Sequence, residues 1–239
     1  MLAGVFSLVF SGLFTLAILA AIIYLIIKGN RKQEVAKKKG NKNLLLHIYL
    51  YLISFATLII AVVGITISLN ALFSYKISIP FSYSVNQLAY DPKDEFSGMT
   101  ESTEKCYQGE ITNILGQNAC FDENKQKKSI ITGLTLTISM LILFALHRIA
   151  IKFAEKKDII IWLKKLYNFA SLIIYSVVSI IATPISIYLT ITYAYFRPED
   201  ITQIEAPGSA IALAIVSIPL WIIFLIATLK LRDKEEKEK

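Results

Sequence analysis

The sequence predicts an all-α multi-pass membrane protein with five transmembrane helices and a small, disulfide-stapled, partly β extracytoplasmic loop domain. Three observations support this prediction. Hydrophobic residues make up 55% of the chain and the mean hydropathy is +0.57. Charged residues are crowded between five long apolar runs instead of within them, and a run of about 20 apolar residues spans the hydrocarbon layer as a helix. Both cysteines fall in the one long loop between these runs.

The predicted elements follow these runs in chain order. Spans are expected at residues 1–28, 44–75, 130–147, 166–196 and 210–230. Between and after them come basic cytoplasmic loops at 29–43 and 148–165, the extracytoplasmic loop domain at 76–129, a short extracytoplasmic loop at 197–209 and a charged cytoplasmic tail at 231–239. The first run has no basic segment before it and no small-residue cleavage site after it, so a retained helix is favoured over a signal peptide. A soluble protein with five buried helices is the less favoured alternative.

Basic residues predict the orientation, because Lys and Arg resist translocation. Residues 28–43, 147–165 and 230–239 hold 18 of the 25 Lys and Arg residues, which places these segments in the cytoplasm. The N-terminus is then extracytoplasmic and the C-terminus cytoplasmic in the plasma membrane. The expected anchors to anionic lipid are Lys28, Arg31, Lys32, Lys37, Lys38, Lys39, Arg148 and Lys152. The basic residues that keep these segments in the cytoplasm explain the net charge of +7. No nucleic-acid partner is expected, since the basic segments lack interleaved aromatic residues.

Residues 76–129 form the only predicted loop that is large enough to be a domain. Residues 77–85 alternate between apolar and small polar side chains, which indicates a half-buried strand, and Pro80 confines such a strand to a sheet edge. Cys106 and Cys120 also lie in this loop. On the oxidising side of a membrane they are expected to form a disulfide that constrains the unfolded loop by about 3 kcal/mol. A redox or metal pair is the alternative, but the loop has neither a C-x-x-C motif nor a histidine.

Residue patterns for catalysis, metal binding or cofactor binding are missing from the sequence. It has no G-x-S-x-G, H-E-x-x-H, Walker or dinucleotide-binding motif, and no ionisable residue at the centre of a predicted span. His47 and His147 lie at the cytoplasmic ends of two spans, where a pair of histidines could hold a metal or sense pH. Neither has a carboxylate or thiol beside it, so interfacial anchoring is the expected role. We therefore expect a protein that is not an enzyme and that has no cofactor or metal.

Hydroxyl side chains mark the fourth predicted span. Ser176, Ser179, Thr183 and Ser186 recur at spacings of three and four, which places them on one helical face. Pro184 removes a backbone hydrogen bond and is expected to kink the helix. The favoured interpretation of this hydroxyl stripe is a close helix–helix contact. The alternative is a polar lining for the path of a neutral solute.

Residues 49–58, YLYLISFATL, begin with aromatic and Leu residues and continue with spaced small residues. The positions that define this pattern are Tyr49, Tyr51, Leu52, Ser54, Thr57 and Leu58. The pattern resembles an uncharacterised bacterial multi-pass membrane family that is known only as a domain of unknown function, and residues 130–195 are more weakly similar to it. The family glycine falls nearer Thr66 than Gly64, and the long cystine-bearing loop is not part of its pattern. The resemblance implies a bacterial membrane protein and no activity.

Two classes of function follow from the sequence. The first is a non-catalytic accessory or scaffold subunit of a membrane assembly with a partner-facing ectodomain. Its expected partners are the lipid bilayer and other membrane protein subunits or a second copy of the chain. The alternative is a channel or transporter for a small neutral solute, lined by the hydroxyl stripe.

Overall fold

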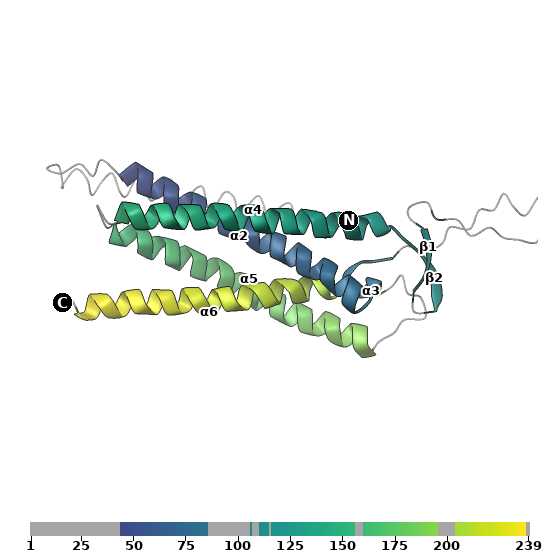
Figure 1. Cartoon of the computed structure of the whole chain (residues 1–239). Coiled ribbons are helices and arrows are strands. Elements are labelled where there is room, and N and C mark those ends of the chain that lie inside the picture. Colours follow the sequence, from purple (N-terminus) through teal and green to yellow (C-terminus); the bar gives the residue numbers. More distant parts are fainter. Residues whose placement is uncertain are drawn as a thin grey trace, which may run out of the picture. The chain divides into compact units, whose positions relative to one another are not determined.

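Figure 1 shows the computed structural model of the chain, which describes residues 44–85, 106, 110–114, 116–155, 160–195 and 204–237. The chain divides into two compact units, Met1–Leu44 and Leu45–Lys239, and the description below concerns the second unit. The predicted first span and the basic loop that follows it lie outside the described residues. So do six of the predicted lipid anchors, Lys28, Arg31, Lys32, Lys37, Lys38 and Lys39.

Four long helices make up most of the described chain. They are α2 (Leu44–Lys76), α4 (Glu123–Glu155), α5 (Ile161–Tyr195) and α6 (Gly208–Lys237). At 30 to 35 residues and a rise of about 1.5 Å per residue, each is longer than the ~30 Å hydrocarbon core of a bilayer. All four contain an apolar window with a mean hydropathy between 2.1 and 2.7, long and apolar enough to cross a membrane. The chain is therefore a multi-pass membrane protein.

Consecutive long helices run in opposite directions (Figure 1). Helices α2 and α5 run toward the end that carries a β hairpin, which we call the hairpin end, and α4 and α6 run away from it. The opposite end, where α4 ends and α5 begins, we call the basic end. Because the helices exceed the hydrocarbon thickness, polar side chains at both ends can lie at or beyond the headgroup layer.

Helices α2 and α4 approach each other closely at two glycines. A Cβ atom added at Gly133 in α4 would lie 2.5 Å from the Ser68 Oγ atom and 2.7 Å from the Ser68 backbone nitrogen in α2. A Cβ atom added at Gly64 in α2 would lie 2.7 Å from the Thr137 backbone nitrogen in α4. The Ser68 hydroxyl donates to the Gly64 carbonyl (3.0 Å) and the Thr137 hydroxyl to the Gly133 carbonyl (2.7 Å). The two backbones are thus in direct contact, and both hydroxyl protons are satisfied within their own helices.

Helices α5 and α6 pack against each other. The buried residues of α5 recur every three or four positions and are Leu163, Tyr167, Ser171, Tyr175, Ser179, Ala182 and Ser186. On α6, Ala212 and Ser217 are fully buried. Small residues on α6 let the two helices approach closely. Pro184 lies inside α5 and Pro219 inside α6, and both helices continue past their prolines.

The edge strand predicted for residues 77–85 is wrong. Helix α2 continues to Lys76, and a single helical turn, α3, follows at Ile79–Ser82 with Pro80 in its first turn. Proline suits that position because its fixed φ is already helical and its missing N–H has no partner to lose there. Phe81 packs edge-to-face between Phe73 and Tyr193, with ring centroids 5.8 and 5.3 Å away. Contact with two long helices therefore outweighs the alternating sequence pattern.

The β structure of the loop lies further along the chain than predicted, in an antiparallel hairpin. Strand β1 (Glu110–Ile114) pairs with β2 (Gln117–Phe121), so that Ile111 is opposite Cys120. Gly116 adopts a φ of 87° in the turn, a conformation that favours glycine. The predicted disulfide is confirmed: Cys106 is bonded to Cys120, with a Cα–Cα distance of 5.6 Å.

The hairpin packs on the segment that follows α3. Tyr83 and Val85 form a buried apolar cluster with three hairpin residues, Ile114, Ala119 and Phe121. The rings of Tyr83 and Phe121 are 5.9 Å apart. The disulfide-bonded hairpin therefore has an apolar core of its own at the hairpin end.

Candidate functional site at the basic end

Tyr167 in α5 is the centre of an aromatic cluster to which all four long helices contribute. Its ring centroid lies 5.4 Å from that of Tyr51 and 6.3 Å from that of Phe55, both in α2. Phe224 in α6 is 6.0 Å away, and the Arg148 guanidinium carbon in α4 lies 5.7 Å from the Tyr167 ring centroid. Tilted and edge-to-face aromatic pairs and a cation over a ring face are all favourable contacts. We call these five residues the Tyr167 cluster.

Glu155, in the last turn of α4, contacts Tyr51 of the Tyr167 cluster in α2 and Lys164 in α5. The Tyr51 hydroxyl donates to Glu155 Oε1 at 2.5 Å, and Lys164 Nζ in α5 lies 3.4 Å from Oε2. The Tyr51 side chain is buried, whereas the Lys164 side chain is 40% exposed. A hydrogen bond to a charged group contributes more than an exposed ion pair. The Tyr51–Glu155 bond is therefore the stronger of the two connections.

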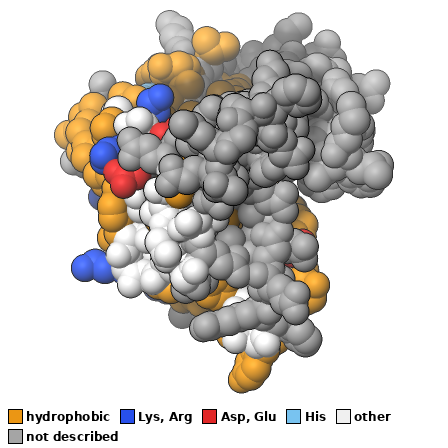
Figure 2. All heavy atoms as spheres, turned by 90° about the vertical axis from the view of Figure 1, so that its right-hand side faces the viewer, with side chains coloured by type: hydrophobic (Ala, Val, Ile, Leu, Met, Phe, Trp, Pro, Cys, Tyr) orange, Lys and Arg blue, Asp and Glu red, His pale blue; other side chains and the backbone are white. Residues whose placement is uncertain are grey.

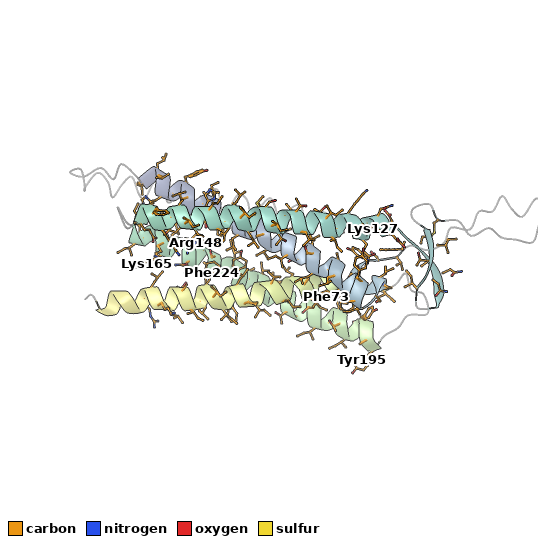
Figure 3. The ribbon with its side chains drawn as sticks, in the orientation of Figure 1. Phe73, Lys127, Arg148, Lys165, Tyr195 and Phe224 are labelled. Atoms are coloured by element: carbon orange, nitrogen blue, oxygen red, sulfur yellow. A yellow bond between two sulfur atoms is a disulfide. The ribbon has the colours of Figure 1, made fainter. Side chains whose placement is uncertain are left out.

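The second aromatic pair of α5 and α6 extends the cluster into the membrane-spanning part. Tyr175 stacks on Phe224 with a centroid distance of 5.6 Å and an interplanar angle of 6°. Tyr175 is two helical turns beyond Tyr167, and both rings contact the same phenylalanine. Figure 3 labels Arg148 on α4 and Phe224 on α6. The arrangement fixes the relative positions of the helices at this end.

Two of the predicted lipid anchors lie within the described chain, and the structure places them differently. Arg148 contacts the Tyr167 ring, which gives it a partner inside the protein besides any lipid headgroup. Lys152, one turn later on α4, is exposed. One of the two cationic side chains is thus directed into the helix contact and the other is available to solvent or lipid.

The hydroxyl stripe of α5 lies largely on its buried face. Ser179 and Ser186 are both less than a tenth exposed, and Ser176 and Thr183 are half-buried. The Thr183 hydroxyl donates to the Ser179 carbonyl (2.7 Å), and the Ser186 hydroxyl donates to the Thr183 carbonyl (2.8 Å). Pro184 has no N–H group, so the Ile180 carbonyl lacks its usual helical hydrogen-bond donor. Neither of these two hydroxyl groups donates to that carbonyl. Two of the four hydroxyl protons of the stripe are thus used within α5.

The two histidines occupy different environments. His47 in α2 is buried, with 1% of its surface exposed. His147 in α4 is half-buried, its Nδ1 atom is 2.7 Å from the Leu143 carbonyl, and its ring lies 6.3 Å from that of Tyr49. Within the described residues, no group of three or more His, Cys, Asp or Glu side chains is placed to hold a metal ion.

Sequence reasoning missed Glu155, because it lies in a charged stretch that was assigned to a loop. Residues 148–165 are predicted as a basic cytoplasmic loop, and α4 continues into this segment as far as Glu155. Tyr51 was noted only for its place in an aromatic–Leu pattern. The structure places Tyr51, Ser54, Thr57 and Leu58 of that pattern on the buried face of α2, whereas Tyr49 and Leu52 are exposed.

Comparison of the chain with protein-family models, with curated proteins and with solved structures finds no match in any of the three.

The Tyr51–Glu155 bond leads to a direct prediction. Replacing Glu155 by leucine is expected to lower the free energy of unfolding by about 1.5–3 kcal/mol, because the buried Tyr51 hydroxyl loses its acceptor. Thermal unfolding in detergent micelles measures the change. In a double-mutant cycle with Tyr51→Phe, the two losses should be less than additive, as expected for groups in contact.

A matched control for this prediction lies at the other end of the same helix. Glu123 pairs with Lys127 at 3.4 Å, the same distance as between Glu155 and Lys164. The two side chains of the Glu123–Lys127 pair are 59% and 60% exposed. Glu123→Leu should change stability by less than about 1 kcal/mol. Equal effects of Glu123→Leu and Glu155→Leu would show that the cluster adds nothing beyond an exposed pair.

Proposed function

We propose that the protein is a non-catalytic accessory or scaffold subunit of a membrane assembly, with the hairpin end directed to an extracytoplasmic partner. In this proposal the protein lies in a bacterial plasma membrane, with its C-terminus in the cytoplasm and its N-terminus on the extracytoplasmic side. The distribution of Lys and Arg among the loops is the basis for this orientation. The likeness of residues 49–58 to an uncharacterised bacterial membrane family agrees with this setting and adds no activity.

The observation that carries the proposal is the use of polar groups within the spans. Ser68 and Thr137 donate to carbonyls of their own helices at the contact of α2 with α4. Thr183 and Ser186 do the same in α5, where Ser179 and Ser186 are buried. Polar residues of this kind stabilise helix–helix contacts, and they leave no set of groups poised for acid–base or nucleophilic chemistry among those described.

The hairpin end supports a partner-facing role. The hairpin is closed by a disulfide and has its own apolar cluster, so its outer surface is held in one conformation. Ile111, Asn113 and Asn118 are exposed on that surface. Figure 2 views this end of the molecule, where the described residues form a patch of uncharged polar side chains and backbone with charged side chains near its edge. A rigid surface reduces the ordering cost of binding.

Helix α4 offers a second contact surface, within the membrane. Only 6% of its most apolar window is buried within the described protein, against 33% for α2. Its exposed residues include Ile138 and Ile142. Lipid tails or the helices of another subunit would cover this face. In a membrane assembly, part of the face would contact lipid and part would contact another subunit.

The test is extraction of the full chain in mild detergent followed by native mass spectrometry. The proposal expects a defined complex with another membrane protein or with further copies of the chain. A lone monomer that also conducts a neutral solute in liposomes would overturn it in favour of a channel or transporter.

Replacing Ser179, Thr183 and Ser186 together by alanine separates the two functions. A solute path lined by the stripe would lose its flux, whereas a packed helix contact would lose stability modestly, at roughly 0.6 kcal/mol per hydrogen bond. The proposal expects assembly to persist in this triple variant.

A further inference from the structure

A cleft of about 520 Å³ opens at the hairpin end, where α2 meets the beginnings of α4 and α6. Its volume is in the range of small-ligand sites. Lys125 and Lys128, both exposed on the first turns of α4, line it together with Ser209 in the first turn of α6. None of these residues belongs to the Tyr167 cluster or to the hydroxyl stripe.

The charges around the cleft favour an anion. Lys125 and Lys128 contribute two positive charges, and Asp122 contributes one negative charge. The Lys125 Nζ atom also lies 5.8 Å from the centroid of the Tyr83 ring, a cation–π contact that positions it beside the cleft. Asp122 is already engaged at the start of α4, where its Oδ1 atom accepts the Asn124 N–H at 2.9 Å. Lys127 is paired with Glu123 and does not line the cleft. The positive end of the α6 dipole at Ser209 adds to the attraction for a negative group.

Hydroxyl and amide side chains also line the cleft. Ser129 and Thr132 follow the lysines along α4, and Thr66 and Asn70 face them from α2. Asn70 donates its Nδ2 group to the Ser82 carbonyl at 3.3 Å, and its Oδ1 atom is buried. The lining of the cleft is therefore mainly apolar, with two cationic side chains and a few hydroxyl and amide groups.

The position of the cleft along α4 matches the border of a membrane. The apolar run of α4 begins at Ile130, directly after Lys128 and Ser129. Ile131, which follows Lys128 by three positions, is 67% exposed and Leu134 is 47% exposed, so an apolar surface begins beside Lys128 and runs around the outer side of α4. Lysines at headgroup depth beside such a surface suit a molecule with an anionic head and apolar chains.

We propose that this cleft binds the phosphodiester headgroup of an anionic phospholipid from the leaflet at the hairpin end. Lys125 and Lys128 contact the phosphate, Ser209 and the N-terminus of α6 approach it from the opposite side, and the acyl chains lie along the exposed apolar face of α4. A free phosphate ion shares the headgroup chemistry but not the chains.

Native mass spectrometry of the full chain in neutral detergent tests the site, with phosphatidylglycerol and phosphatidylcholine of identical chains added in equal amounts. Wild-type protein should retain more phosphatidylglycerol than phosphatidylcholine. In the K125Q/K128Q variant, the ratio of bound phosphatidylglycerol to bound phosphatidylcholine should fall about fivefold for each lysine removed. S209E should also lose it, although a glutamate in the first turn of α6 favours the helix and leaves folding intact.

The matched control is K76Q/K127Q, which removes two exposed lysines from the same end without touching the cleft. It should keep the preference of the wild-type protein. Equal retention of the two lipids by wild-type protein, or an equal loss in K76Q/K127Q and K125Q/K128Q, would overturn the proposal. Displacement of the lipid by millimolar inorganic phosphate would assign the cleft to a soluble phosphate compound and would overturn the lipid assignment.

Discussion

Replacement of Gly133 by leucine is expected to force α2 and α4 apart and to lower the free energy of unfolding by about 3 kcal/mol, the upper end of the usual cost of overpacking. Even the first added carbon would lie 2.5 Å from the Ser68 hydroxyl oxygen and 2.7 Å from the Ser68 backbone nitrogen. The Ser68 side chain could rotate its hydroxyl away from the added carbon, but the Ser68 backbone could move only together with the whole of α2. Thermal unfolding in detergent micelles measures the loss.

Ser139 provides the matched control, since it is a small residue on the same helix and is exposed. Ser139→Leu should leave the midpoint of unfolding close to that of the wild-type protein. Gly133→Ala combined with Ser68→Ala should recover only part of the Gly133→Ala loss, because the Ser68 backbone nitrogen stays in place. A stability of Gly133→Leu equal to that of Ser139→Leu would contradict the close backbone contact.

Replacement of Tyr167 by alanine is the second change with a large expected effect, a loss of about 3 kcal/mol in the free energy of unfolding. This is the lower end of the range for aromatic core residues, because lipid as well as water can cover the vacated site. The loss arises because the rings of Tyr51, Phe55 and Phe224 all contact Tyr167. Arg148 would also lose the ring face beneath its guanidinium.

The control for this change is Tyr188, which lies on the same helix but is 63% exposed. Tyr188→Ala should alter stability by less than about 0.5 kcal/mol. Tyr167→Phe keeps the ring and should retain most of the stability of the wild-type protein. Comparable losses for Tyr167→Ala and Tyr188→Ala would rule out a central role for the Tyr167 cluster.

The membrane-spanning helices and the disulfide could be predicted because their causes are local. Four of the five predicted spans correspond to long apolar helices in the described chain, since hydropathy within one segment decides whether it can cross lipid. Cys106 and Cys120 were the only possible pair in the chain. The edge strand at 77–85 failed for the opposite reason, because Phe81 packs against α2 and α5.

The contacts of the candidate site could not be predicted, because they join distant parts of the chain. Tyr51 and Glu155 are separated by 104 positions, and their pairing depends on how α2 and α4 cross. Gly64 and Gly133 each precede a hydroxyl residue by four positions, which is a recognisable small-xxx-small pattern. This pattern marks both sides of the helix crossing in the sequence, but it does not indicate which helices meet there.

We propose that the described helices cross the membrane with the hairpin end outside and the basic end in the cytoplasm. Lys127 and Lys152 test it directly, because both are exposed and they lie near opposite ends of α4, about 37 Å apart along the helix. Each is replaced by cysteine in turn, and spheroplasts are treated with a membrane-impermeant maleimide that does not react with the native disulfide. We expect labelling of Lys127→Cys in intact spheroplasts and of Lys152→Cys only after permeabilisation. Labelling of both positions from outside would show that α4 does not span the membrane, and the reverse pattern would contradict the orientation.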